Sequence, residues 1–192
     1  MSVFDRILPK TLEWEGGSKF TEDPADPGGA TRYGISLRFL RGLGQAGDID
    51  HDGDVDAGDI RALTEDQASE FYRREFWDKC LCDELPDQVA MAVFDTAVNL
   101  GVPRAVKMLQ SEANAVLLNN PLVVDGRMGK NTVDGVLDAV NLEGSDKLTL
   151  GYLNRRLRFY FALAKAPARA KYLRGWTRRV AALKEVIKGA PA

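Results

Sequence analysis

The residues best suited to acid–base chemistry lie near the N-terminus, between Glu13 and Ser36. Glu15 is followed by Gly16 and Gly17, and the loop behind them carries further carboxylates and a threonine. Cleavage of a glycosidic bond needs one carboxylic acid to protonate the leaving oxygen and a second group on the opposite face of the sugar. Judged from residue types alone, acids beside a Gly-Gly pair are more often solvated loop residues.

A helix must position Glu15. Apolar residues at positions 4, 7, 8, 12 and 14 recur at helical spacing and predict a helix that ends at the two glycines. Glu15 would then feel the negative end of the helix dipole, which favours the protonated form of a carboxylic acid. Glu13 and Glu22 compete with Glu15 for the acid role. Glu13 lies about 200° around the helix from Glu15, so we expect its side chain to be solvated.

The rest of the chain is also patterned for helices, and the predicted fold class is mainly α. Further helices are predicted over residues 36–43, 64–77, 87–99, 105–118, 132–140 and 147–187, with a break near Pro167 in the last. Strand signals are confined to residues 20–35 and 122–124. Residues 101–103 (Gly-Val-Pro) are the predicted boundary between a catalytic lobe, residues 1–100, and a helical lobe, residues 101–192.

A second cluster of candidate ligands lies between positions 48 and 59, where six aspartates fall within twelve residues. Their spacing fits the EF-hand loop, with oxygen ligands at positions 1, 3, 5, 7, 9 and 12 and Gly53 at position 6. Without a cation these carboxylates would repel one another, although a solvated acidic loop with Asx turns is the alternative. The spacing predicts a structural calcium ion (Ca²⁺) bound by Asp48, Asp50, Asp52, Asp54, Asp56 and Asp59.

Composition argues against several other kinds of site. The single histidine, His51, rules out a histidine-rich metal site. Cys80 and Cys82 are separated by one residue and are interpreted as buried apolar residues. No apolar run reaches the roughly 18–20 residues needed to cross a bilayer, and the N-terminus lacks the apolar core of a signal peptide. We therefore expect synthesis in the cytoplasm.

Charge is distributed unevenly along the chain. From Asn154 to the C-terminus eleven Lys and Arg residues accompany one acid, Glu185, so this basic segment carries +10 and the remainder −12. A basic segment suits an anionic partner. Its apolar residues fall at helical spacing, however, so the cations could equally form the solvated face of helices. No nucleic-acid recognition motif accompanies the charge, and nucleic acid is not an expected partner.

Beyond these physical arguments, the run from position 15 to 35 resembles the signature of glycoside hydrolase family 108, the N-acetylmuramidases of bacteria and phages. The matching elements are EGG at 15–17 and DPADPGGATRYGI at 23–35. Residues 70–77 (EFYRREFW) and 94–101 (FDTAVNLG) resemble later segments of the family. Residues 107–110, 124–132 (VDGRMGKNT) and 173–180 (LRGWTRRV) resemble the predicted peptidoglycan-binding region that accompanies it.

The resemblance implies a lysozyme-like helical fold with a small loop or hairpin at the active site, to which the EF-hand-like loop is added. It implies that Glu15 is the general acid that cleaves the β-1,4 bond between N-acetylmuramic acid and N-acetylglucosamine in peptidoglycan. By analogy with phage lysozymes, Asp26 or Asp23 would have a stabilising or positioning role in the reaction, and Thr31 would orient the attacking water. Alternatively, Asp26 caps a turn and Thr31 bonds to the backbone. A lytic transglycosylase and a non-catalytic wall-binding module are the competing functions.

The expected partners follow from this resemblance. They are peptidoglycan glycan strands and, through the basic segment, anionic outer-membrane or wall polymers. We expect a monomer. The enzyme would reach the periplasm or cell wall, and lyse the cell, after release by a holin or a secretion system.

Overall fold

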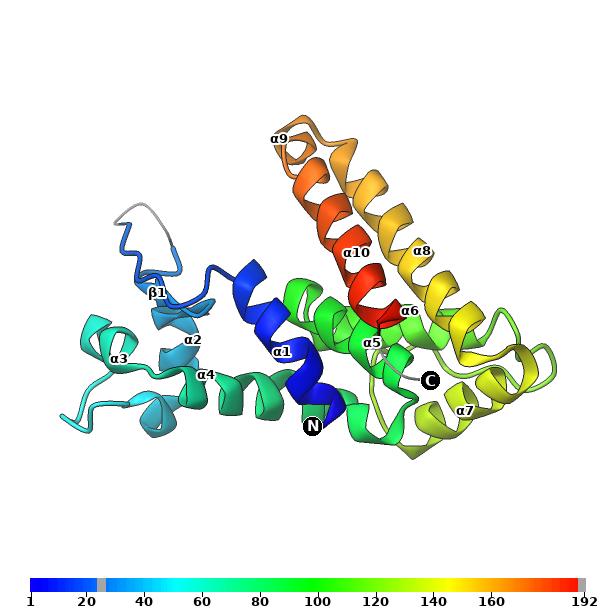
Figure 1. The fold of residues 1–192 in the computed structure, drawn as a ribbon, viewed down its shortest axis with the longest axis horizontal. Helices are drawn as coiled ribbons and strands as arrows, with labels where there is room; N and C mark the ends of the chain where they lie inside the picture. Colours follow the sequence, from blue (N-terminus) through cyan, green and yellow to red (C-terminus); the bar gives the residue numbers. More distant parts are fainter. Residues whose placement is uncertain (24–26, 190–192) are drawn as a thin grey trace. The chain divides into compact units, whose positions relative to one another are not determined.

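A computed structural model describes residues 1–23 and 27–189 (Figure 1). The mainly α class is confirmed, since within these residues strand structure is limited to one small hairpin and an isolated bridge. The chain forms two compact units, one of Leu8–Tyr72 and the other of Met1–Ile7 with Arg73–Ala192. This division by contacts differs from the lobes of residues 1–100 and 101–192, which were drawn by function and remain a prediction.

The unit Leu8–Tyr72 is built from short helices and the hairpin. Its elements are the later part of α1 (Val3–Trp14), β1 (Thr31–Arg32), β2 (Ile35–Ser36), α2 (Leu37–Gly42), the 3-10 helix η1 (Gly44–Gly47), α3 (Ala57–Ala62) and α4 (Glu65–Tyr72). The two strands are antiparallel, and Thr31 pairs with Ser36. The Ser36 hydroxyl then accepts a hydrogen bond from Phe39 N at 3.2 Å and so begins α2.

Thr64 begins α4 as predicted. Its hydroxyl accepts from Gln67 N at 3.2 Å, while the Gln67 side chain accepts from Thr64 N at 3.0 Å, which is a capping box. The predicted helix of residues 64–77 changes character after Tyr72, where the π-helical turn η2 (Arg73–Trp77) follows.

The larger unit is organised around α5 (Asp87–Leu100), in which every residue from Val89 to Ala97 is buried. The remaining elements are the 3-10 helices η3 (Asp78–Cys80) and η4 (Cys82–Glu84), and the helices α6 (Val102–Ala113), α7 (Lys130–Glu143), α8 (Ser145–Ala164), α9 (Pro167–Ala170) and α10 (Leu173–Lys188). Helix α5 contacts the short helices before it and α6, α8 and α10. The sequence pattern of α5 predicted a single apolar face. Because other helices contact α5 on several sides, no side of its middle faces solvent.

Two predictions in this unit were wrong in detail. The helix predicted over 105–118 begins and ends earlier, because Pro103 fits the first turn of α6 and the helix stops at Ala113. Residues 122–124 do not form a strand. Instead, the Asn114 side chain accepts from Leu122 N at 2.6 Å and donates to Leu122 O at 2.8 Å, which satisfies the backbone there locally.

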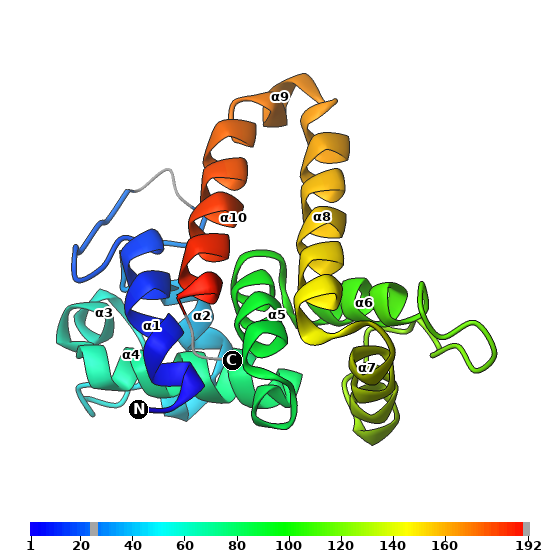
Figure 2. The same ribbon diagram turned by 45° about the vertical axis from the view of Figure 1, so that its right-hand side comes forward.

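The long C-terminal helical segment breaks near Pro167, as predicted. Figure 2 shows α8 and α10 as two arms joined through α9. None of the described helices combines the length and apolarity needed to cross a bilayer. Cys80 and Cys82 are both buried and free, which confirms the prediction that they are buried apolar residues. Burial and the neighbouring Cys80 side chain raise the pKa of the Cys82 thiol well above 9.0.

A buried ion-pair cluster ties α5 to both arms. Asp95 on α5 accepts from Arg156 Nη1 on α8 at 2.5 Å and from Arg179 Nη2 on α10 at 2.8 Å. Burial alone would raise the pKa of Asp95, but the two guanidinium groups outweigh it and hold the pKa below 3.8. Not all cations of the basic segment are therefore solvated, because Arg156 is fully buried and Arg155 pairs with Glu112 at 2.9 Å.

Candidate functional site

The end of α1 explains why two glycines follow Glu15. Gly17 N donates to Leu12 O at 2.8 Å and Gly16 N donates to Glu13 O at 3.3 Å. These are the two hydrogen bonds of a Schellman cap, in which the residue after the helix adopts a left-handed conformation. Gly16 has φ +97° and Gly17 has φ +58°. The cap fixes Glu15 as the residue directly after α1, half-buried.

The hairpin turn packs directly on Glu15. Tyr33 and Gly34 are the two central residues between β1 and β2, both with positive φ, as in a type I′ turn. A Cβ at Gly34 would lie 2.5 Å from Glu15 Cβ and 2.5 Å from Tyr72 Oη, so only glycine fits between them. Tyr33 N also donates to Gly17 O at 2.9 Å, which joins the turn to the helix cap.

Tyr72 completes this arrangement from α4. Its hydroxyl is buried and donates to Tyr33 O at 2.9 Å, holding the backbone of the turn. The position was missed as a site residue by sequence reasoning, although it falls in the run EFYRREFW that carries part of the family resemblance. Glu15 is thus held by a helix cap, a glycine of the hairpin and a tyrosine 57 positions along the chain.

The competing acids and the predicted helpers are placed differently. Glu13 pairs with Lys10 at 2.7 Å and is exposed, as expected, while Glu22 pairs with Arg61 at 2.8 Å. The Thr31 hydroxyl donates to Gly29 O at 3.3 Å, which fits the backbone-bonding interpretation of this residue. Asp26 lies outside the described residues.

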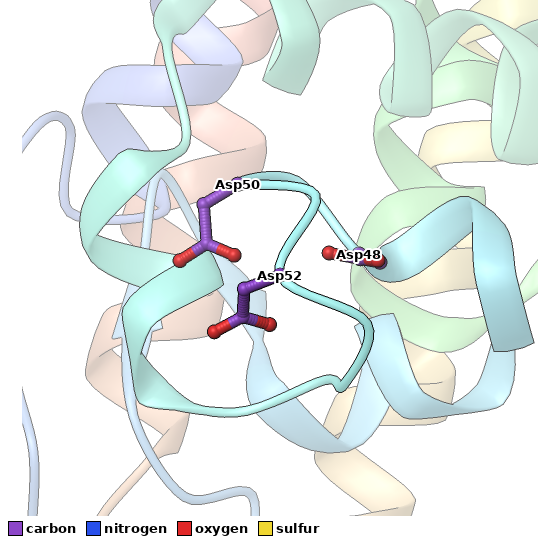
Figure 3. Close-up of side chains that lie close together, drawn as sticks. All are labelled: Asp48, Asp50 and Asp52. Atoms are coloured by element: carbon purple, nitrogen blue, oxygen red, sulfur yellow. The ribbon is translucent and has the colours of Figure 1, made fainter.

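The aspartate loop forms two groups of carboxylates. Asp48, Asp50 and Asp52 bring oxygens within 4.8 Å of one another, and Figure 3 shows these side chains around the turn of the loop. Asp54, Asp56 and Asp59 form the second group. Gly53, at the sixth position, has φ +103°, which is the left-handed conformation that the motif requires of it.

Asp59, the twelfth position of the loop, is buried and binds the loop backbone. Its two oxygens accept from Ile49 N and Asp56 N, each at 2.6 Å. Burial alone would raise the pKa of Asp59, but these backbone hydrogen bonds outweigh it and lower the pKa below 3.8. Asp59 therefore closes the two ends of the loop on each other and is grouped apart from Asp48, Asp50 and Asp52.

The first group fits a cation. The Asp48 Oδ1 atom is buried and accepts no hydrogen bond from the described residues. Partial desolvation and the charges of Asp52 and Asp59 raise the pKa of Asp50, and Asp52 is the main cause that raises the pKa of Asp54. A buried oxygen without a hydrogen-bond donor thus lies beside carboxylates that repel one another. A hard divalent cation would neutralise this group of carboxylates.

Comparisons with known proteins match two regions of the chain. Residues 8–101 match the family model described as Glycosyl hydrolase 108, and residues 104–181 match the one described as Predicted Peptidoglycan domain. The chain is 29% identical to the protein in a solved structure titled "Structure of Brucella abortus SagA". The two superpose with a TM-score of 0.73, covering 96% of this chain and 92% of the other. No match was found among curated proteins.

The two matched regions follow each other along the chain and fit the motifs described above. The first contains Glu15, its glycine cap and the hairpin, and the second contains most of α6 and all of α7 and α8. Residues 8–101 form a glycosyl hydrolase 108 domain and a predicted peptidoglycan domain follows it, so the chain is a peptidoglycan hydrolase.

Proposed function

We propose that the protein is an N-acetylmuramidase in which Glu15 is the general acid. The bond cleaved is the β-1,4 linkage between N-acetylmuramic acid and N-acetylglucosamine, and cleavage of enough strands lyses the cell. The observation that carries the proposal is the packing of Glu15 between its Schellman cap and Gly34, inside the region matched by the hydrolase family. A catalytic carboxyl group must be held in one place, and this packing supplies that restraint.

In this reaction the bond between the anomeric carbon and the bridging oxygen breaks. The Glu15 carboxyl group donates its proton to that oxygen, so the departing sugar leaves with a hydroxyl group. A water oxygen forms a new bond to the anomeric carbon, and one proton of that water passes to a base. Asp23, Asp26 and Thr31 are the candidates for guiding or activating that water.

The test is a pair of matched substitutions, Glu15→Gln and Glu13→Gln. The first keeps the size of the side chain and its packing on Gly34 but removes the acid, so the rate should fall by about 10²–10⁴-fold. Reducing ends released from purified peptidoglycan and turbidity loss of permeabilised cells measure the rate. Glu13→Gln should retain activity, since Glu13 is an exposed partner of Lys10. A folded Glu15→Gln protein with full activity would exclude the assignment.

Product analysis separates the competing functions. A muramidase releases products with reducing ends, whereas a lytic transglycosylase leaves 1,6-anhydro ends that lack one water, which mass spectrometry distinguishes. A wall-binding module would bind peptidoglycan and release neither product.

We also propose that the aspartate loop binds Ca²⁺ as a structural ion. Asp48, Asp50 and Asp52 would supply side-chain oxygens, and the buried Asp48 Oδ1 supports this most directly. When bound, the ion would neutralise the loop. The loop would then hold α3, which Asp56 and Asp59 begin with a capping box.

The remaining cations of the basic segment support binding to anionic wall or outer-membrane polymers. Those near the junction of α8 and α10 are exposed: Lys165, Arg169, Lys171 and Arg174. Phe161 and Tyr172 nearby are 54% and 50% exposed. No acid occurs between Lys147 and Lys184, so nothing in this stretch of sequence opposes the positive charge.

A further inference from the structure

A cationic groove of about 420 Å³ runs between α6 and α8. Most of its lining lies in the region matched by the predicted peptidoglycan domain, and two lining residues precede that region. It is lined by Leu100, Pro103, Arg104, Lys107, Met108, Ser111 and Arg155. Three of these residues are cations, three are apolar, and none is an acid. The groove therefore combines positive charge with an apolar wall.

The structure holds Lys107 in the groove through a glycine. A Cβ at Gly126 would lie 3.0 Å from Lys107 Cγ, 3.1 Å from Lys107 Cε and 2.6 Å from Pro103 O. Gly126 also has φ +82°, which disfavours any side chain. The aliphatic part of Lys107 thus lies against the backbone at Gly126, which restrains this side chain.

A second glycine positions Arg155. Gly151 lies inside α8, where glycine is less favourable than alanine. A Cβ at Gly151 would overlap the Glu112 carboxylate. Glu112 uses this space to accept from Arg155 Nε at 2.9 Å, and Arg155 Nη2 donates to Ser111 O at 3.2 Å. The guanidinium group is therefore oriented before any ligand arrives.

Arg104 is restrained as well, since its guanidinium carbon lies 4.5 Å from the centre of the Phe159 ring. The side chains of the three cations around the groove are thus each restrained by a different kind of contact. Preorganised cations of this kind bind carboxylates with little loss of side-chain entropy.

We propose that this groove binds the peptide stems of peptidoglycan through their carboxylates. These stems are short peptides that carry free carboxylates and aliphatic side chains, and they match both the charge and the apolar wall. A glycan strand fits less well, because it presents many hydroxyl groups and the groove offers one, on Ser111. That hydroxyl already donates to Lys107 O at 2.7 Å.

This inference deepens the proposed function by naming the part of the substrate that the second region holds, and it does not depend on Glu15. The test is binding of the full chain, at low temperature, to intact sacculi and to sacculi whose stems an amidase has removed. Both are first anchored to a solid support through their glycan hydroxyls, so that loss of the cross-links does not release the strands. Wild type should bind intact sacculi about tenfold more tightly. Lys107→Glu should lose that difference, whereas Arg158→Glu, exposed on α8 and outside the groove lining, should keep it.

Equal binding to both kinds of sacculi, or equal losses in the two charge variants, would overturn the proposal. Reducing ends measured in parallel keep the two proposals apart. Stem-dependent binding without release of either reducing ends or 1,6-anhydro ends would support the groove while removing the catalytic role of Glu15.

The positioning role of Gly151 has its own control. Gly151→Ala should weaken stem-dependent binding, while Gly175→Ala in α10, where a Cβ meets nothing within 4 Å, should not. Adding Glu112→Ser to Gly151→Ala removes the overlap but releases Arg155, so the melting temperature should recover and the binding should not. Recovery of both would show that Gly151 matters only for packing and would contradict the positioning role.

Discussion

Asp95 and the aspartates of the loop from Asp48 to Asp59 are the same residue type in opposite surroundings. Asp95 is completely buried and is neutralised by Arg156 and Arg179. The loop carboxylates are mostly exposed, and the hydrogen bonds described for them come from backbone amides. Among the residues that the structure describes, no salt bridge joins a loop aspartate to a lysine or arginine.

The difference lies in where the neutralising charge comes from. For Asp95 the chain itself supplies two cations, so the ion pairs form whenever the protein folds. The six loop aspartates concentrate negative charge within twelve residues, and each close pair repels by about 1 kcal/mol in water-like surroundings. If the loop binds calcium as proposed, its neutralisation would depend on an ion from solution. The pairs of Asp95 would then form without help from the medium, whereas the loop would respond to it.

The largest expected effect comes from breaking the internal pair. Asp95→Asn leaves two arginines without their carboxylate, one of them fully buried, and should lower the free energy of unfolding by about 3–5 kcal/mol. Urea denaturation measures the loss. Asp138→Asn, at an exposed position of α7, is the matched control and should change little. A loss below about 1 kcal/mol for Asp95→Asn would mean that the pairs contribute little to stability.

A smaller effect is expected from supplying the external cation. Calcium at about 100 times its dissociation constant should stabilise the protein by about 2.7 kcal/mol over protein in EDTA. Thermal melts measure the shift. The double variant Asp50→Asn/Asp52→Asn should lose the response to calcium, yet be no less stable than wild type in EDTA, because repulsion in the loop is relieved. An identical melting temperature of wild type in calcium and in EDTA would count against the site.

The smallest effect is a difference in pH dependence. Because the pKa of Asp54 is raised in the folded protein, its destabilising charge is absent below pH 3.8 and develops as the pH rises through the higher folded value. In EDTA, Asp54→Asn should therefore match wild type below pH 3.8 and exceed its melting temperature above that range. Asp95 has a lowered pKa, so its contribution has the opposite sign and is lost as the pH falls through its folded value. An advantage of Asp54→Asn that grows on acidification would contradict this account.

The contrast also explains what could be predicted from the sequence. The end of α1 just before Glu15 and the turn at Gly53 were predictable because each depends on residues a few positions apart. Asp95 was recognised only as part of the FDTAVNLG resemblance. Its partners Arg156 and Arg179 lie 61 and 84 positions away. Nothing in the sequence distinguishes these two from the other cations of the basic segment, which has eleven.

The packing around Glu15 illustrates the same limit. The glycine cap is local, but Tyr72 reaches the turn at Tyr33 from 39 positions away, through a contact that no spacing rule encodes. For the same reason the groove was not foreseen. It depends on the spaces that Gly126 and Gly151 leave for side chains from another helix, and these become visible only when the helices are packed.

The complete burial of the middle of α5 has a consequence for how the larger unit comes apart. Amide hydrogens exchange with water when a segment opens locally, and a helix at the surface can open without disturbing its neighbours. The stretch Val89–Ala97 has no such freedom, because exposing any turn of it requires the helices around it to separate. Its amides should therefore exchange only when the whole unit unfolds, and α5 sets the size of that cooperative step.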